Sequence, residues 1–207
     1  MKNYSLLLIA FLFSAGMMAQ DRGDIVLDVH GTYTFSNNVN FDYGHIDIGD
    51  GFTYGAGLEF FPQKSTSVEL KYLRLDTSMD VDVPNVANPG VNGDINGDGA
   101  FNYILIGGNH YFDNGNNAVP YLGGGIGMAI TEGPYGGSDT NFAWEIKGGV
   151  KIKTASIVSI SLQANLISTV AAAGTDTYWG YWGPVAVQDY AYSYQFGLGA
   201  IFGFNFK

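Results

Sequence analysis

The most regular hydrophobic pattern in the chain is an alternation of period two over residues 190–206. Mostly large apolar side chains occupy one set of positions, and mostly small or polar side chains occupy the positions between them. The first set is Tyr190, Tyr192, Tyr194, Phe196, Leu198, Ala200, Phe202, Phe204 and Phe206. A strand places two such sets on opposite faces, whereas a helix would scatter them around its surface. The pattern therefore predicts a long C-terminal strand with one aromatic face.

Seven earlier stretches also predict strands. Five of them alternate clearly between apolar and polar positions, while two are apolar and glycine-rich on both faces, which leaves their register open. The clear stretches are 25–35, 52–60, 67–72, 142–153 and 158–166, and the weaker ones are 100–112 and 120–131. The total is eight, and an even number lets both ends of a barrel lie on the same side.

The links between these stretches alternate in length. The short links are 62–65, 113–119 and 154–156, and the long links are 36–51, 79–99, 132–140 and 170–189. Long loops on one side and short turns on the other are typical of bacterial outer-membrane barrels. The long links contain many acidic residues and no Lys or Arg, so the outer surface is predicted to be strongly acidic.

Small residues on one strand face and bulky ones on the other suit a narrow barrel surrounded by lipid. The prediction is therefore an all-β fold, an eight-stranded antiparallel up-and-down transmembrane β-barrel, with Gly and polar residues filling the lumen. The alternative is a secreted soluble barrel with a lipocalin-like binding role. The continuous Phe and Tyr face of the C-terminal strand argues against that alternative, because it is unusual for a surface in water.

Three segments carry a resemblance to a known family. Residues 120–129, Pro-Tyr-Leu-Gly-Gly-Gly-Ile-Gly-Met-Ala, look like a recurring Pro-Tyr-x-Gly-x-Gly-x-Gly strand, and 142–150 look like the strand that follows it. Over residues 24–207 the chain resembles the small outer-membrane β-barrel proteins, the OmpX-like and OmpA-transmembrane-like group. The resemblance implies a place in the cell outer membrane, contact with its lipid, and the barrel-assembly machinery as a partner that reads the aromatic C-terminal strand. Lys207 after Phe206 departs from the family's usual terminal aromatic residue.

Composition argues against some partners and excludes Cys chemistry, and the N-terminal residues predict how the chain is divided. The 9 Lys and Arg against 19 Asp and Glu give a net charge of −10, which argues against a nucleic-acid partner. The chain has no Cys, which excludes disulfides, thiol chemistry and a Cys-linked lipid anchor. Lys2, the apolar run 6–13 and the small residues up to Ala19 predict a signal peptide over 1–19, followed by a barrel domain over 20–207.

Charged residues on the inward face are predicted to form structural ion pairs, because an unpaired buried charge is costly. The set is Asp28, Glu59, Glu69, Lys71, Glu145 and Lys147. An eight-stranded interior is filled by its own side chains, which disfavours a proton relay or a selectivity filter. Lys151 also faces inward, but it and Lys153 lie near the periplasmic rim, where we expect water to solvate them.

One long link resembles the first half of a calcium-binding loop. Asp94, Asn96 and Asp98 place carboxylate and amide oxygens at alternate positions, where they can converge on a hard cation. Leu105 stands where the closing carboxylate of such a loop belongs. The alternative is a surface turn rich in Asn, Asp and Gly. Apart from this calcium ion, we expect no cofactor.

Four aromatic residues gather in the last long link. They are Tyr178, Trp179, Tyr181 and Trp182. Exposed aromatics in such a cluster can stack on a sugar or contact a partner. The alternative is an aromatic girdle at the outer surface of the membrane.

The three histidines do not form a catalytic motif. His30 faces inward beside Asp28, but no Ser has a Gly-x-Ser-x-Gly context, and His45 and His110 lie in a loop and near a strand end. Nucleophilic catalysis needs Ser, His and an orienting group in contact, so we expect no enzymatic activity. The leading hypothesis is a non-enzymatic outer-membrane protein for envelope integrity, surface interaction or adhesion. The alternatives are a narrow pore for small solutes and a lipid-modifying enzyme that uses His30.

Overall fold

The computed structural model describes residues 23–41, 44–82, 95–113, 115–133, 138–154, 156–180 and 183–206. These residues form ten strands. They are β1 (Ile25–Thr34), β2 (Asn37–Phe41), β3 (Gly44–Ile48), β4 (Gly51–Gln63), β5 (Thr66–Asp82), β6 (Ile95–Tyr111), β7 (Ala118–Glu132), β8 (Ser138–Lys153), β9 (Val158–Gly180) and β10 (Gly183–Phe206). Among the described residues, no helix is long and apolar enough to cross a membrane.

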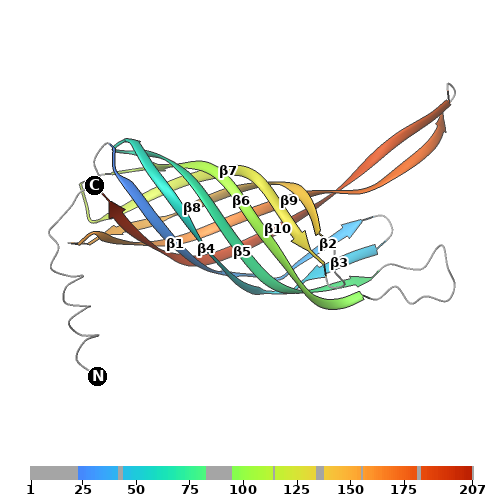
Figure 1. The fold of residues 1–207 in the computed structure, drawn as a ribbon, viewed down its shortest axis with the longest axis horizontal. Coiled ribbons are helices and arrows are strands. Elements are labelled where there is room, and N and C mark those ends of the chain that lie inside the picture. Colours follow the sequence, from blue (N-terminus) through green and yellow to red (C-terminus); the bar gives the residue numbers. More distant parts are fainter. Residues whose placement is uncertain are drawn as a thin grey trace.

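Eight of the strands close into an antiparallel barrel (Figure 1). Strand β1 pairs with β4 on one side and with β10 on the other, where Ile25 lies opposite Phe206. From β4 to β10 each strand pairs with the next one along the chain, including β5 with β6. Every barrel strand therefore has a neighbour on both sides, and the ring is closed. The eight-stranded antiparallel barrel predicted from the alternation is therefore confirmed, with the aromatic C-terminal strand as the closing strand.

Several strands are longer than the hydrophobic pattern predicts. Strands β5 and β6 run into the predicted link 79–99, and β9 and β10 run through most of 170–189. Within 36–51, β2 and β3 form a hairpin, and Ile48 of β3 pairs with Met79 of β5. The predicted extents of these links were wrong. Outside the membrane no lipid requires every second residue to be apolar, so the alternation fades while the backbone pairing continues.

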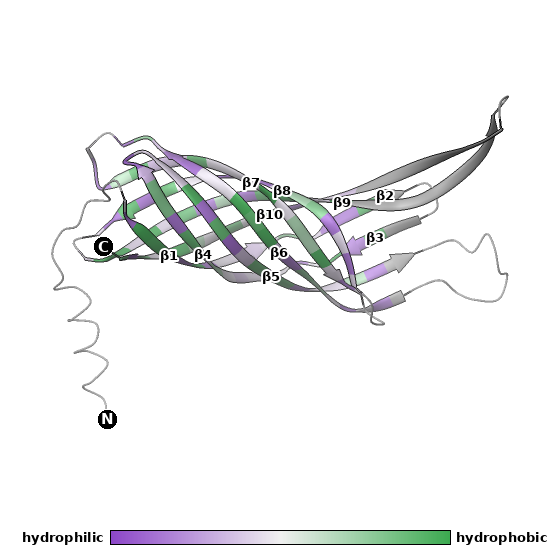
Figure 2. Ribbon diagram, turned by 45° about the horizontal axis from the view of Figure 1, so that its top comes forward, coloured by the Kyte–Doolittle hydropathy of each residue, from purple (hydrophilic) through white to green (hydrophobic). Residues whose placement is uncertain are grey.

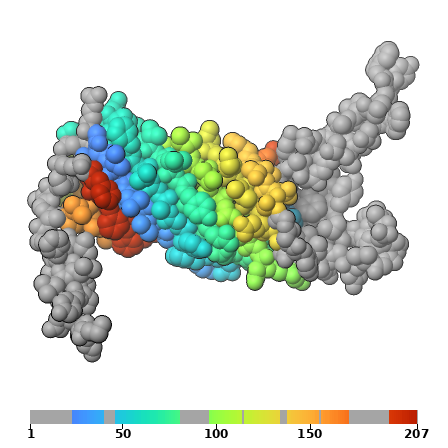
Figure 3. Space-filling model, viewed as in Figure 1, coloured from blue at the N-terminus to red at the C-terminus, as the bar shows by residue number. Residues whose placement is uncertain are grey.

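The barrel presents an apolar outer wall. Leu58, Ile106 and Leu122 are 54%, 56% and 57% exposed, and large hydrophobic side chains of the other strands share this outward face. Figure 2 shows the resulting bands of hydrophobic colour along the oblique strands of the barrel. On the face seen in Figure 3, side chains of neighbouring strands lie against one another as continuous oblique bands. Closed backbone pairing and an apolar exterior are the two features that a strand protein needs in lipid, and they exclude the soluble alternative.

An arginine placed on the outer face should test where the membrane lies. Ile126 is 58% exposed near the middle of β7, so Ile126→Arg should lower the free energy of unfolding by about 2–4 kcal/mol. The matched control is Ile152→Arg at the periplasmic end of β8, where the cost should be about 0–1 kcal/mol. Urea unfolding in lipid vesicles, followed by tryptophan fluorescence, measures both. Equal costs at the two positions would contradict the placement of the apolar wall in lipid.

Candidate functional site

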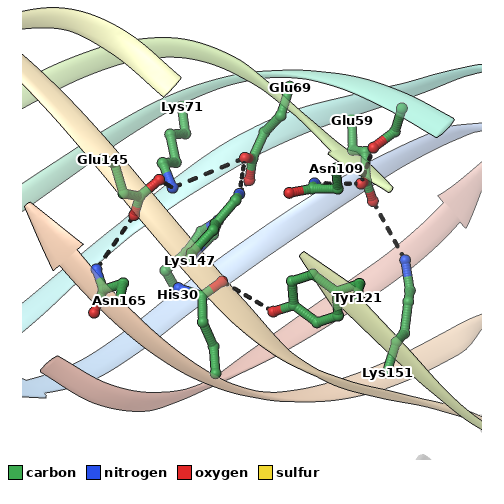
Figure 4. A network of polar contacts seen from close by, with 12 residues as sticks. His30, Glu59, Glu69, Lys71, Asn109, Tyr121, Glu145, Lys147, Lys151 and Asn165 are labelled. Carbon is green, nitrogen blue, oxygen red and sulfur yellow. Dashed lines mark hydrogen bonds and ion pairs between the residues drawn. The ribbon is translucent and has the colours of Figure 1, made fainter. Parts of the chain in front are cut away.

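A network of charged side chains fills the middle of the lumen (Figure 4). Its ionic members come from β4, β5 and β8, and each is at most 3% exposed. They are Glu59, Glu69, Lys71, Glu145, Lys147 and Lys151. The alternation of the strands directs these side chains inward, since successive residues of a strand point to opposite faces.

The ion pairs nearer the centre cross the lumen between β5 and β8. Lys71 Nζ lies 2.5 Å from Glu145 Oε2, and Lys147 Nζ donates to Glu69 Oε2. Lys71 Nζ also lies 3.8 Å from Glu69 Oε2. Asn165 of β9 donates its Nδ2 to Glu145 Oε1 at 3.2 Å. Because β5 and β8 are not neighbours in the sheet, the Lys71–Glu145 and Lys147–Glu69 pairs join separate parts of the wall.

Nearer the periplasmic end, Glu59 is the centre of a second group. It accepts hydrogen bonds from Ser67 Oγ at 2.5 Å, Asn109 Nδ2 at 2.7 Å and Tyr111 OH at 2.6 Å. Lys151 Nζ lies 3.3 Å from Glu59 Oε2 and 5.2 Å from the centre of the Tyr111 ring. The four donors to Glu59 offset the cost of burying its charge. The ion pair with Glu59 and the contact with the Tyr111 ring do the same for the Lys151 ammonium.

Lys151 therefore differs from the sequence-based expectation. It is 2% exposed, whereas its position toward the periplasmic rim suggested solvation by water. The rings of Phe61 and Tyr111 cover it, and neither contact can be read from the strand on which Lys151 lies. Asn109 and Tyr111 were likewise missed, because the alternation around 100–112 is weak. The ion pairing predicted for the inward charges does not extend to Asp28, which takes no part in the ion pairs among the described residues.

Two glycines make room for this network. A Cβ at Gly57 would lie 3.0 Å from Lys71 Cβ and 3.4 Å from His30 Nε2. A Cβ at Gly123 would lie 2.2 Å from Asn109 Oδ1. Long polar side chains therefore cross the lumen at levels where neighbouring strands contribute only backbone.

Apolar clusters close the lumen on both sides of the network. The periplasmic cluster consists of Val26, Phe61, Tyr111, Val119 and Tyr121. The outer cluster consists of Val39, Ile48, Leu73, Leu75, Met79, Phe101, Tyr103, Leu105, Ala129, Ala143 and Ile167. The hairpin β2–β3 contributes Val39 and Ile48 to the outer cluster. The cavity beside the network has a volume of about 10 Å³, which is room for about one water molecule.

Outside the lumen, a second polar group lies on the outward face of β4 to β7. Arg74 Nε donates to Asp76 Oδ1 at 2.8 Å and its NH1 donates to Asn102 Oδ1 at 3.0 Å. Tyr72 OH donates to the same Asn102 oxygen at 2.7 Å, and Asn102 Nδ2 donates to Glu132 Oε1 at 2.9 Å. An open pocket of about 550 Å³ adjoins this group at the outer end of the barrel. Arg74 is the only cationic residue described in this half of the barrel's exterior.

The predicted calcium residues are only partly described. Asp94 lies outside the described residues, and Asn96 and Asp98 lie on β6, which pairs with β5 and is not a loop. Asn96 donates to the Asp80 carboxylate when its amide is oriented to suit its neighbours. Leu105, at the position of the missing carboxylate, is buried in the outer cluster. Calcium binding stays a prediction.

The remaining candidates are dispersed. Tyr178 and Trp179 lie on β9, beyond the part whose side chains are placed, and Tyr181 and Trp182 lie outside the described residues, so the aromatic contact site stays a prediction. His30 is 4% exposed in the lumen. His110 Nδ1 lies 3.3 Å from Thr66 Oγ1 at the periplasmic end.

Two lysines on β8 give a direct test of the buried network. Lys151→Met leaves Glu59 buried without its ion-pair partner, and we expect a loss of about 3–5 kcal/mol in unfolding free energy. In the control, Lys153 Nζ donates to Asp113 at 2.7 Å and so holds the pKa of that exposed carboxyl below its usual range. Lys153→Met should cost less than about 1 kcal/mol. Urea unfolding in detergent measures both, and adding Glu59→Gln to Lys151→Met should restore part of the loss. Similar small costs for both lysines would mean that Lys151 is solvated.

Comparisons with known proteins identify the fold. No protein-family model and no curated protein sequence matches the chain. Among solved structures, the outer membrane protein OprG from Pseudomonas aeruginosa is similar, with a TM-score of 0.57 at 12% identity, over 90% of this chain and 98% of that one. Outer membrane protein AlkL matches with a TM-score of 0.53 at 12% identity, over 94% and 95% of the two chains. Neisserial surface protein A matches with a TM-score of 0.52 at 12% identity, over 87% and 98%. The chain therefore has the fold of the small outer-membrane β-barrels, and its apolar wall is suited to that membrane.

Proposed function

We propose that the protein is a closed, non-enzymatic outer-membrane barrel that acts through its outer end, in surface interaction or adhesion. The observation that carries the proposal is the filled lumen. The charged network lies between the periplasmic cluster and the outer cluster, so the interior is occupied by side chains from end to end of the described barrel. In a membrane, such a barrel meets water only at its two ends, and its strands continue farther at the outer end.

The outer end is built from continued strands. Beyond the apolar wall, β5 and β6 remain paired as far as Val81 and Ile95, and the β2–β3 hairpin extends the wall beside them. Extended, paired strands hold side chains at fixed spacings, which favours a binding surface over a free loop. This supports a role in contact with a partner outside the cell.

The charge of the outer end favours a cationic partner. The exposed carboxylates there belong to Asp47, Asp50, Asp76, Asp80, Asp98 and Asp139. Arg74 already donates to the Asp76 and Asn102 side chains described above. Surface charge of one sign steers partners of the opposite sign and repels partners of the same sign.

The histidines support a non-enzymatic role. A lipid-modifying enzyme would need its catalytic groups within reach of a lipid at the membrane surface. His30 is buried in the lumen among Glu69, Lys71 and Lys147, behind the apolar wall. This position suits a structural or ligand-holding role for His30.

Conductance tests the closed lumen. Purified protein inserted into planar lipid bilayers should give no reproducible single-channel steps, because the two clusters and the ion pairs leave no continuous path for ions. A known channel former in the same bilayers is the control for bilayer quality. Steps of one size in successive insertions would contradict the proposal and favour the pore.

Electrostatic binding tests the role of the outer end. The protein in vesicles should bind a cationic peptide, and binding should weaken as salt rises from about 0.01 M to about 0.15 M, because the Debye length falls from about 30 Å to about 8 Å. A variant with Asp50, Asp76, Asp80 and Asp98 changed to Asn should bind less. An anionic peptide of the same length is the control. Equal binding of both peptides, or an unchanged signal in the variant, would show that charge at this end selects no partner.

A further inference from the structure

Three polar side chains converge in the lumen, and one of them has a buried ring nitrogen without a hydrogen-bond partner. Asp28 and His30 lie on β1 and Glu69 lies on β5, and one ligand atom from each lies within 4.8 Å of the others. All three are buried. Gly57 of β4 lies between β1 and β5 and has no side chain to separate them, as its position close to His30 Nε2 shows.

The His30 ring nitrogen is the unexplained atom of this group. His30 Nε2 is buried and has no hydrogen-bond partner. Its nearest carboxylate oxygen is Glu69 Oε1, at 3.6 Å, which is too long for a hydrogen bond. A buried polar atom in a native protein normally has a hydrogen-bond partner or another ligand, so the lack of one at His30 Nε2 needs an explanation.

The spacing fits two ligands of one metal ion. A nitrogen and an oxygen that each lie about 2.1 Å from a tetrahedral zinc ion are about 3.4 Å apart. His30 Nε2 and Glu69 Oε1 are 3.6 Å apart. Asp28 lies two residues before His30 on the same face of β1, and its ligand oxygen lies within 4.8 Å of the other two ligand atoms, so it is the candidate for the third ligand.

The other oxygen of Glu69 is already engaged, which leaves Oε1 available. Lys147 Nζ donates to Oε2, and Lys71 Nζ lies 3.8 Å from the same oxygen. These contacts orient the carboxylate with Oε1 toward His30. Hydrogen bonds from neighbouring side chains to the second oxygen of a metal-binding carboxylate commonly fix its orientation.

The charge balance of the interior also favours a cation. The buried carboxylates among the described residues are Asp24, Asp28, Glu59, Glu69 and Glu145, and the buried lysines are Lys71, Lys147 and Lys151. Asp24 accepts from Asn205 at the periplasmic end. The remaining carboxylates still outnumber the lysines, and Asp28 is the one outside the ion pairs. A positive ion beside Asp28 would offset this excess.

We propose that Asp28, His30 and Glu69 form a lumenal binding site for a divalent transition-metal ion, with zinc as the ion to test. One imidazole nitrogen and two carboxylate oxygens suit zinc and its neighbours better than calcium or magnesium, which prefer oxygen ligands alone. The ammonium groups of Lys71 and Lys147 oppose the ion. Glu145, which lies 2.5 Å from Lys71 Nζ, offsets one of these two charges, and Lys147 pairs with Glu69 itself. The site would join β1 to β5 through the lumen, past β4.

The experiment uses the full chain, refolded in detergent with and without one equivalent of cobalt(II) or zinc, because the closed barrel allows little entry after folding. Bound metal is measured after gel filtration. Folding is checked by comparing the mobility of boiled and unboiled samples on SDS gels, since a closed barrel that resists SDS changes its mobility on boiling. We expect about one ion per barrel, retained when Asp113 or His110 is changed to Asn or Gln. His30→Gln and Asp28→Asn should each lower retention by at least about tenfold. Retention in His30→Gln equal to that of the native chain would overturn the site.

A second measurement needs no variant. X-ray absorption of the zinc-loaded native protein should show an imidazole and oxygen ligands at about 2.0–2.2 Å. Absence of the imidazole signal, or native protein that refolds with zinc and retains none, would overturn the proposal. In nitrogen NMR of the same sample, a His30 ring protonated on both nitrogens would also overturn it, since that ring would hold a proton and pair with Glu69 in place of a metal.

Discussion

The pairing of β1 with β10 is the constraint on which the rest of the structure depends. In lipid no water is present to satisfy backbone N–H and C=O groups, so every strand within the membrane needs a neighbour on each side. The register of this pair runs without a break from Ile25 opposite Phe206 to Thr34 opposite Gly197. Once the ring is closed, alternate residues have only two environments, lipid outside and a narrow lumen inside. The apolar wall and the charged interior both follow from that division.

Burying charged side chains in the lumen costs desolvation free energy, which the fold offsets by pairing most of them. Ion pairs removed from water recover their desolvation cost only when the geometry is good and the remaining donors and acceptors are satisfied. Glu59 meets that standard with three neutral donors and Lys151, and Glu145 meets it with Lys71 and Asn165. Around Asp28 and His30 the standard is not met. The incomplete part of the network is therefore where a ligand is inferred.

The sequence predicted the membrane part of the fold well and the rest less well, for a physical reason. Lipid selects apolar residues at every second position, so the strands that cross the membrane show their period in the sequence. Beyond the membrane this selection ends, and the outer parts of β9 and β10 looked like a loop. The inward direction of the charges could be predicted from the same period. Their partners could not, because Lys71 and Glu145 lie on strands that meet only across the lumen. Lys151 was misjudged because its cover comes from Phe61 and Tyr111, on other strands.

The register of the closing pair has a consequence for biosynthesis. Its partners lie at opposite ends of the described chain, so the ring cannot be completed while any later strand is still missing. Until then, β1 has an edge of unpaired backbone groups, which is a template for pairing with other chains. A chain that stops early would keep this edge permanently. The order of the strands therefore leaves this edge open until β10 is present, and the last strand of the barrel is the one that protects the first.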